Sequence, residues 1–315
     1  MPITLSELLR RVDPKTEERV EGARRRANTT VRNLLRDRTR LSFSFDDEGQ
    51  RRVRQVSVTL DPGRPHNLQD IEFDDDILVL LELSKVRTLL EAGALRWSNY
   101  QSVNQMLAAN ESIQMQPLDG ALFEHHQERF KELLQVLDTR DPLQKILHLE
   151  HDILGEYSYG TNFYGEEVGE VFIYWGIIGL VSDLLGVNVE DLTIVVLAHE
   201  LAHAYTHQGF EIDGTQWESK RFKSVDKSVK EGLAQYFTHL FLTSKQDSFP
   251  DAFDAFEKLR EKQAACYSTH KAWVTDNTPE HVRRAMLEAR RSKDVVSKER
   301  FDEMLSAAKK ALSFG

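Results

Sequence analysis

Apolar residues recur at helical spacing along most of this chain, and a few stretches alternate instead. Residues 4–38 follow the helical pattern with a restart at Pro14, a residue that suits a first helical turn. Residues 41–60 alternate apolar and polar positions on both sides of DDEGQ, which predicts a β-hairpin. Helical spacing returns between residues 74 and 137 in three segments, ILVLLELSKVRTLLEAG, NYQSVNQMLA and LFEHHQERFKELLQVL.

The pattern changes again after residue 150. ILGEYSYG and EVFIYW are rich in β-forming residues and are separated by TNFYGEEVG, which predicts a hairpin with an extended loop. IIGLVSDLLGV predicts a helix closed by Gly186, and NVEDLTIVVLAHELAHAYTHQG predicts a longer helix, capped by Asn188 or Asp191 and followed by Gly209. Four more helices are predicted at DKSVKEGLAQYFTHLFLT, FPDAFDAFEKLREKQAA, PEHVRRAMLEARR and KERFDEMLSAAKKAL.

These elements predict a small β-sheet packed against helices, which is an α+β fold. The changes of pattern suggest three regions. Residues 1–145 form a mostly helical N-terminal regulatory or recognition domain that contains the 41–60 hairpin, residues 146–275 form a second domain, and residues 276–315 form a helical extension.

Composition indicates a protein of a reducing compartment. Of the 315 residues, 40% are apolar, enough to bury a sizeable core without covalent links. Cys266 is the single cysteine, so neither an intrachain disulfide nor a cysteine zinc cluster can form. The N-terminal stretch lacks the pattern of a signal peptide, and no apolar run approaches the roughly 20 residues that span a bilayer. We therefore expect a cytoplasmic protein with no membrane partner.

Charge is unevenly distributed. The net charge is -10, yet residues 1–54 hold 14 Lys and Arg against 9 Asp and Glu. A patch for nucleic acid or another acidic partner is one interpretation of this basic segment, but the interleaved acids favour a solvated helix face.

The candidate chemistry lies in residues 199–203, H-E-L-A-H, on the long apolar helix. Two histidines four apart lie on one helical face, so both imidazoles can bind one cation. Glu200 is placed to reach a water on that cation without itself being the easiest ligand. The spacing suits one Zn²⁺ per chain, held by three protein ligands with one position open to water. A helix that uses these side chains as ordinary buried polar residues is the alternative, but burying them without partners would be costly.

A third ligand must come from elsewhere. His207 continues the same face but lies one turn too far along the axis, so it is expected to cap the helix or meet solvent. Glu211 and Asp213 follow Gly209 too closely unless the chain reverses sharply, and Glu218 is a further candidate. Glu231 is the best candidate. It lies on the next predicted helix beside the small residues Gly232 and Ala234, and the 27 residues between His203 and Glu231 allow a loop and a return.

H-E-x-x-H on one helix and E-G-L-A on the next resemble the gluzincin class of zinc metallopeptidases, with their thermolysin-like active-site helices. The resemblance covers roughly residues 150–275 and implies a zincin-like fold for that domain. It implies His199, His203 and Glu231 as zinc ligands and Glu200 as general base, and it implies that EVFIYW is an edge strand that binds substrate. One position departs from the family pattern, because Gln235 stands where a carboxylate orients a ligand histidine.

The resemblance further implies hydrolysis of protein or peptide substrates. An extended peptide would pair with backbone groups around Phe172 to Trp175. The donor that steadies the oxyanion would follow the ligand helix, where AACYSTHKAW offers Tyr267 and His270. The alternative, from a different class, is an inactive zincin scaffold that serves as a binding or sensor protein, with nucleic-acid contact through the basic segment as a variant. The intact Glu200 favours the enzyme.

Overall fold

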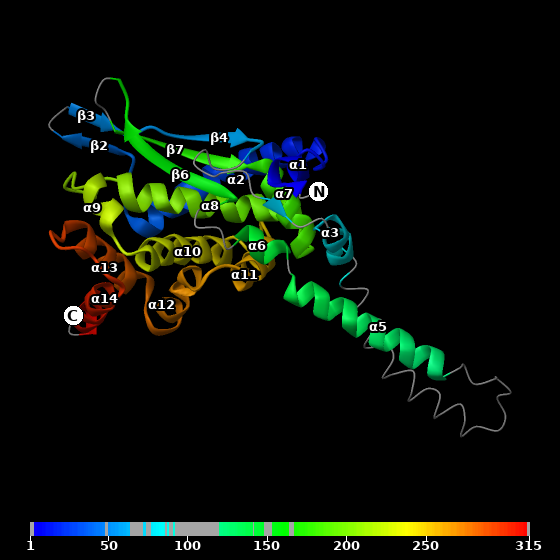
Figure 1. Cartoon of the computed structure of the whole chain (residues 1–315). Helices are drawn as coiled ribbons and strands as arrows, with labels where there is room; N and C mark the ends of the chain where they lie inside the picture. Colours follow the sequence, from blue (N-terminus) through cyan, green and yellow to red (C-terminus); the bar gives the residue numbers. More distant parts are fainter. Residues whose placement is uncertain are drawn as a thin grey trace. The chain divides into compact units, whose positions relative to one another are not determined.

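The computed structural model describes residues 3–47, 50–63, 72–73, 77–85, 87, 91, 120–140, 142–147, 153–163 and 167–313. Helices and small sheets both occur, so the α+β class is confirmed (Figure 1). The chain divides into two compact units: residues 1–5 with 71–146, and residues 6–70 with 147–315. None of the helices in these described ranges combines the length and the apolar character needed to cross a bilayer.

The two units differ from the predicted domains. A boundary does fall near residue 145, but residues 6–70 belong to the same unit as residues 147–315, and so does the C-terminal segment 276–315. The physical reason is that helix α2 (Lys15–Thr39) packs along helix α8 (Val189–Gln208), the helix that carries H-E-L-A-H. The N-terminal helix is therefore part of the core around the candidate site.

The first unit is built from short strands and helices. Strand β1 (Ile3–Thr4) pairs antiparallel with β5 (Glu72–Phe73), and α3 (Ile77–Lys85) packs on α5 (Gly120–Thr139). Leu80 and Leu137 are buried where these two helices meet, and α6 (Pro142–Leu147) follows. The helix predicted at NYQSVNQMLA lies outside the described residues.

Helix α8 is the centre of the second unit. Except for Glu190 and Asp191 in its first turn, its residues are buried, as expected of a helix that is largely apolar on all faces. It contacts α2, α10, α7, α11 and two strands of the sheet. The helices of this unit are α1 (Leu5–Leu9), α2, α7 (Trp175–Leu185), α8, α9 (Ser219–Ser224), α10 (Lys227–Ser244), α11 (Ala252–Lys262), η1 (Ala265–Ser268), α12 (His270–Asp276), α13 (Pro279–Arg291) and α14 (Lys298–Ser313).

The sheet of the second unit has the order β4 (Val56–Asp61), β7 (Glu167–Tyr174), β6 (Gly155–Thr161). Strands β6 and β7 form the predicted antiparallel hairpin, and β4 pairs with β7 in parallel. The interpretation of EVFIYW as an edge strand is therefore wrong, because β7 is paired on both sides. Among the described strands of this sheet, β6 and β4 are the edges.

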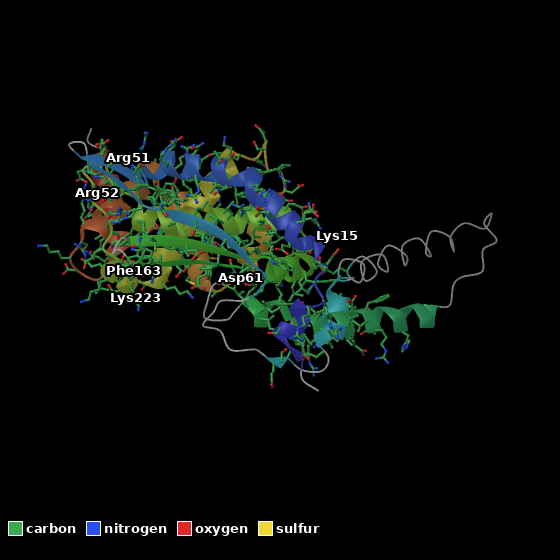
Figure 2. All side chains as sticks on the ribbon, turned by 90° about the horizontal axis from the view of Figure 1, so that it is seen from above. Lys15, Arg51, Arg52, Asp61, Phe163 and Lys223 are labelled. Atoms are coloured by element: carbon green, nitrogen blue, oxygen red, sulfur yellow. The ribbon has the colours of Figure 1, made fainter. Side chains whose placement is uncertain are left out.

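The predicted hairpin at residues 41–60 is confirmed in part. Strands β2 (Ser44–Asp47) and β3 (Gln50–Val53) pair antiparallel, but Val56–Asp61 leaves the hairpin and joins β7. Figure 2 shows Arg51 and Arg52 at the end of the unit opposite Lys15 and Asp61. Much of the basic N-terminal segment is paired within the chain, since Arg24 and Arg25 bind Glu21, and Arg54 binds Glu167.

Candidate metal centre

Two neighbouring helices position the candidate ligands. Helix α8 carries His199 and His203, and α10, which packs beside it, carries Glu231. The start of α10 is fixed by Asp226, whose side chain accepts a hydrogen bond from the Ser228 amide. Gly232 lets α10 fit closely, because a Cβ there would lie 2.6 Å from the Trp273 ring on α12.

The three side chains converge on one point. His199 Nε2 lies 3.1 Å from His203 Nε2, and each of these nitrogens lies 3.2 Å from Glu231 Oε2. All three residues are buried, with exposed fractions of 6%, 7% and 7%. Within the described residues they form the one group of three or more His, Cys, Asp and Glu side chains arranged to hold a metal ion.

The geometry fits a bound cation. Two ligand atoms about 2.1 Å from a tetrahedral ion are about 3.4 Å apart, close to the 3.1 and 3.2 Å edges of this triangle. Hydrogen bonds alone explain the triangle less well than a cation does. A neutral imidazole has a single N–H and cannot donate it along two edges of the triangle at once. Burial raises the pKa of Glu231, but the imidazoles of His203 and His199 lower it more, so the carboxylate stays ionised. Two imidazoles and one carboxylate are a donor set typical of zinc.

Glu200 follows His199 on α8, and its side chain faces the edge strand β6. Its side chain is buried, with an exposed fraction of 2%. At Gly155, the first residue of β6, a Cβ would lie 2.9 Å from Glu200 Cγ and 3.1 Å from Glu200 Oε1. The strand thus begins directly against the carboxylate, and the absence of a side chain at Gly155 permits this approach.

The two candidate oxyanion donors are placed differently. Tyr267 is buried in η1, with its ring centroid 6.0 Å from that of His199. His270 is buried against the rings of His239 and Phe256, and its Nδ1 lies 3.1 Å from the Tyr267 carbonyl oxygen. Burial, with a contribution from His239, lowers the pKa of His270 to about 4, so this imidazole is neutral near pH 7. Tyr267 is therefore the better placed of the two, and His270 supports the backbone of η1.

Gln235 does not take over the role of the missing carboxylate. It is buried one turn after Glu231, but its Oε1 accepts no hydrogen bond from any residue that the structure describes. A carbonyl oxygen held this way orients no ligand imidazole.

The expectation that His207 meets solvent is wrong. Its exposed fraction is 0%, its Nδ1 lies 2.9 Å from the Tyr157 hydroxyl on β6, and its Nε2 lies 3.1 Å from Ser219 Oγ. Its exclusion as a metal ligand stands, because it lies outside the triangle. His207 instead ties the last turn of α8 to the edge strand.

The burial of His207 makes stability depend on pH. Burial, reinforced by the charge of Arg290, lowers the pKa of His207 to about 3. The unfolded chain takes up this proton near pH 6.5, so between these values the unfolded state binds more protons and acid destabilises the fold. His207→Asn should therefore flatten the fall in unfolding free energy below pH 6.5, by up to about 1.4 kcal/mol per pH unit.

The measurement is urea denaturation between pH 7.5 and 4 with a chelator present throughout. Tyr157→Phe is the matched control, because it breaks the same hydrogen bond and keeps the titrating imidazole. It should retain the wild-type slope. Equal slopes for wild type and His207→Asn would contradict the assignment.

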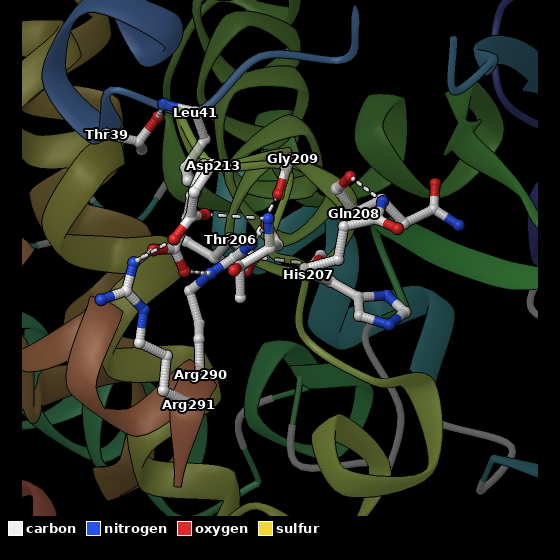
Figure 3. A network of polar contacts seen from close by, with 12 residues as sticks. Thr39, Leu41, Thr206, His207, Gln208, Gly209, Asp213, Arg290 and Arg291 are labelled. Carbon is white, nitrogen blue, oxygen red and sulfur yellow. Dashed lines mark hydrogen bonds and ion pairs between the residues drawn. The ribbon is translucent and has the colours of Figure 1, made fainter. Parts of the chain in front are cut away.

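Arg290, a residue that the sequence did not single out, closes the end of α8 (Figure 3). This residue of α13 has an exposed fraction of 0% and donates to the carbonyl oxygens of Thr206 and Gly209, the latter at 2.5 Å. Its Nε also lies 3.2 Å from Glu211 Oε1. A signal was present, because Val282, Met286 and Arg290 follow one another at four-residue spacing on the buried face of α13.

A scan against protein-family models and searches of the curated proteins and of the solved structures found no match for this chain.

Proposed function

We propose that the second unit is a zinc-dependent peptidase with its centre at His199, His203 and Glu231. The observation that carries the proposal is the buried triangle of two imidazole nitrogens and one carboxylate oxygen. A second buried carboxylate belongs to Glu200, the residue after His199 on the same helix. Zinc bound there would supply a Lewis acid that polarises a carbonyl and acidifies a water. Three protein ligands would leave a position for that water.

The protein's own residues would manage the proton. Glu200 would accept a proton from the attacking water and deliver it to the leaving amine. Its burial supports this role, because a site closed to bulk water limits the loss of the proton to solvent during the reaction. The Tyr267 ring beside His199 makes its hydroxyl the best candidate to donate to the developing oxyanion.

The sheet suggests how an extended substrate would bind. Strand β6 pairs with β7 on one side, and no other described strand pairs with it. Such an edge can accept a peptide as a further strand through backbone hydrogen bonds, which makes few demands on side chains. Because β6 begins at Gly155 against Glu200, a peptide along this edge would pass the proposed base.

The test combines metal content with cleavage. Purified protein is expected to hold about one zinc per chain and to cleave members of a mixed peptide library, as followed by mass spectrometry. His203→Ala should lose the metal and the cleavage together, because it removes one of three ligands. His207→Asn is the matched control, one turn along the same helix, and should keep the metal.

Two results would contradict the proposal. Full zinc content in His203→Ala would exclude this triangle as the metal centre. Stoichiometric zinc without cleavage of any peptide would instead favour the inactive scaffold, whose role would be binding or sensing.

A further inference from the structure

A hollow lies in the same unit, lined by residues that the proposed zinc chemistry does not use. It is a pocket of about 670 Å³, within the range of small-molecule sites. Four of its lining residues are arginines from two helices: Arg36 and Arg40 at the end of α2, and Arg283 and Arg291 on α13. Three carboxylates also line it, those of Asp37, Asp46 and Glu211.

The arginines that line the pocket differ in whether they have a carboxylate partner. Glu211 is already bound by the buried Arg290 as well as by Arg291. Arg283 pairs with Glu280 on its own helix. Arg40 makes no ion pair with any residue in the described ranges, and its pocket neighbour Arg36 pairs with the adjacent Asp37 at 3.6 Å. Arg291 also pairs with Asp213. Of the four lining arginines, Arg40 is therefore the one whose guanidinium has no carboxylate partner in the described ranges and can take an outside anion.

Arg40 also has an unusual backbone conformation, which supports the assignment independently of its charge. It has φ 59° and ψ 26°, the left-handed conformation, and among the described residues it is the one non-glycine with positive φ. Helices commonly end in this conformation at glycine, because a Cβ is strained there. An arginine in this position indicates that its side chain is needed, since glycine would close α2 with less strain.

Further basic residues lie next to the pocket on the far side of Arg40. A neighbouring hollow of about 580 Å³ shares Asp37 and Arg40 with the first and adds Arg38 and Lys245. The first pocket also has apolar wall residues, Leu41, Phe210 and Leu287, and at its rim Ile212 is 97% exposed. A ligand that fits both features carries several negative charges and a part that can lie on apolar side chains.

We propose that this pocket binds a phosphate chain, as carried by a nucleoside polyphosphate. The lining arginines belong to two different helices, and a phosphate chain offers acceptor oxygens to each of them, whereas one planar carboxylate offers two oxygens. Ser42 and Ser44 line the pocket too, and their hydroxyls, 3.3 Å apart, are further polar groups that can donate to a ligand. The net charge of -10 favours a small ligand in a local pocket over a long nucleic acid on the surface.

Arg40→Gly is the most informative variant, because it removes the charge and places the preferred residue at the left-handed position. It should unfold at the same urea concentration as wild type or a higher one, yet bind ATP at least tenfold more weakly by isothermal titration calorimetry. The titrations use the full chain, low salt and EDTA. Arg26→Ala is the matched control, an exposed arginine of α2 that lines neither hollow, and should change the affinity less than twofold.

Inorganic tripolyphosphate, adenosine and a 20-nucleotide single strand complete the set of probes. Binding of ATP above tripolyphosphate would identify a nucleotide as the source of the phosphate chain, and equal binding would identify the chain alone; both support the site. Failure of ATP and tripolyphosphate to bind would overturn the proposal. Equal losses in Arg40→Gly and Arg26→Ala would overturn it too, as would binding of the single strand without either small probe.

Discussion

Glu200→Gln is expected to abolish most peptide cleavage while the protein keeps its zinc. The amide has the size and shape of the carboxylate but cannot accept a proton from water, and loss of a general base lowers rates by about a hundred- to ten-thousandfold. The ligand atoms of His199, His203 and Glu231 are untouched by this change. Initial rates on a cleaved peptide, with metal analysis of the same preparation, test both halves of the expectation.

Glu190→Gln is the matched control for this variant. It makes the same acid-to-amide change on α8, but in the first turn, where Glu190 pairs with Arg19. It should keep both activity and metal. A Glu200→Gln protein that cleaves at the wild-type rate would remove Glu200 from the mechanism, and loss of zinc would show that Glu200 helps to hold the metal.

Arg290→Met is expected to lower the free energy of unfolding by about 3–5 kcal/mol, the usual effect of breaking a buried ion pair. Burial lowers the pKa of Arg290 to about 10 against the opposing effect of Glu211, so the guanidinium is charged at pH 7. The variant would leave Glu211 without this partner and would remove the donor to the Thr206 and Gly209 carbonyls (Figure 3). Carbonyls at the end of a helix have no partner inside the helix, which is why a buried cation there stabilises α8 strongly.

Urea denaturation measures the change, and Arg283→Met on the same helix is the control. Arg283 pairs with Glu280 near the surface, with side-chain exposures of 23% and 50%, and such a pair contributes about 1 kcal/mol or less. Arg290→Lys keeps a charge without the forked donors and should fall between the two. A loss in Arg290→Met no larger than that in Arg283→Met would show that the buried guanidinium does not hold α8.

The candidate site could be predicted largely from local pattern. Two histidines four apart must share a face of any helix, and the apolar residues around them required that helix to be buried. Glu231 followed from the loop length and from the small residues beside it. His270 could not be placed this way. Its three-residue spacing from Tyr267 indicates that the two residues are close, but it does not indicate which of them faces the imidazoles of His199 and His203.

The sequence by itself determined long helices such as α8 and α10, the β6–β7 hairpin and the three side chains of the candidate metal centre, because each depends on a repeat within one element or a short connection. The tertiary structure alone decided that β7 lies between two strands, that α2 packs beside α8, and that Arg290 closes the end of α8. Each of these joins residues about 80 or more positions apart. Such contacts depend on how the faces of two elements pack against each other. The spacing of apolar residues within one helix or strand does not indicate which other element it will contact.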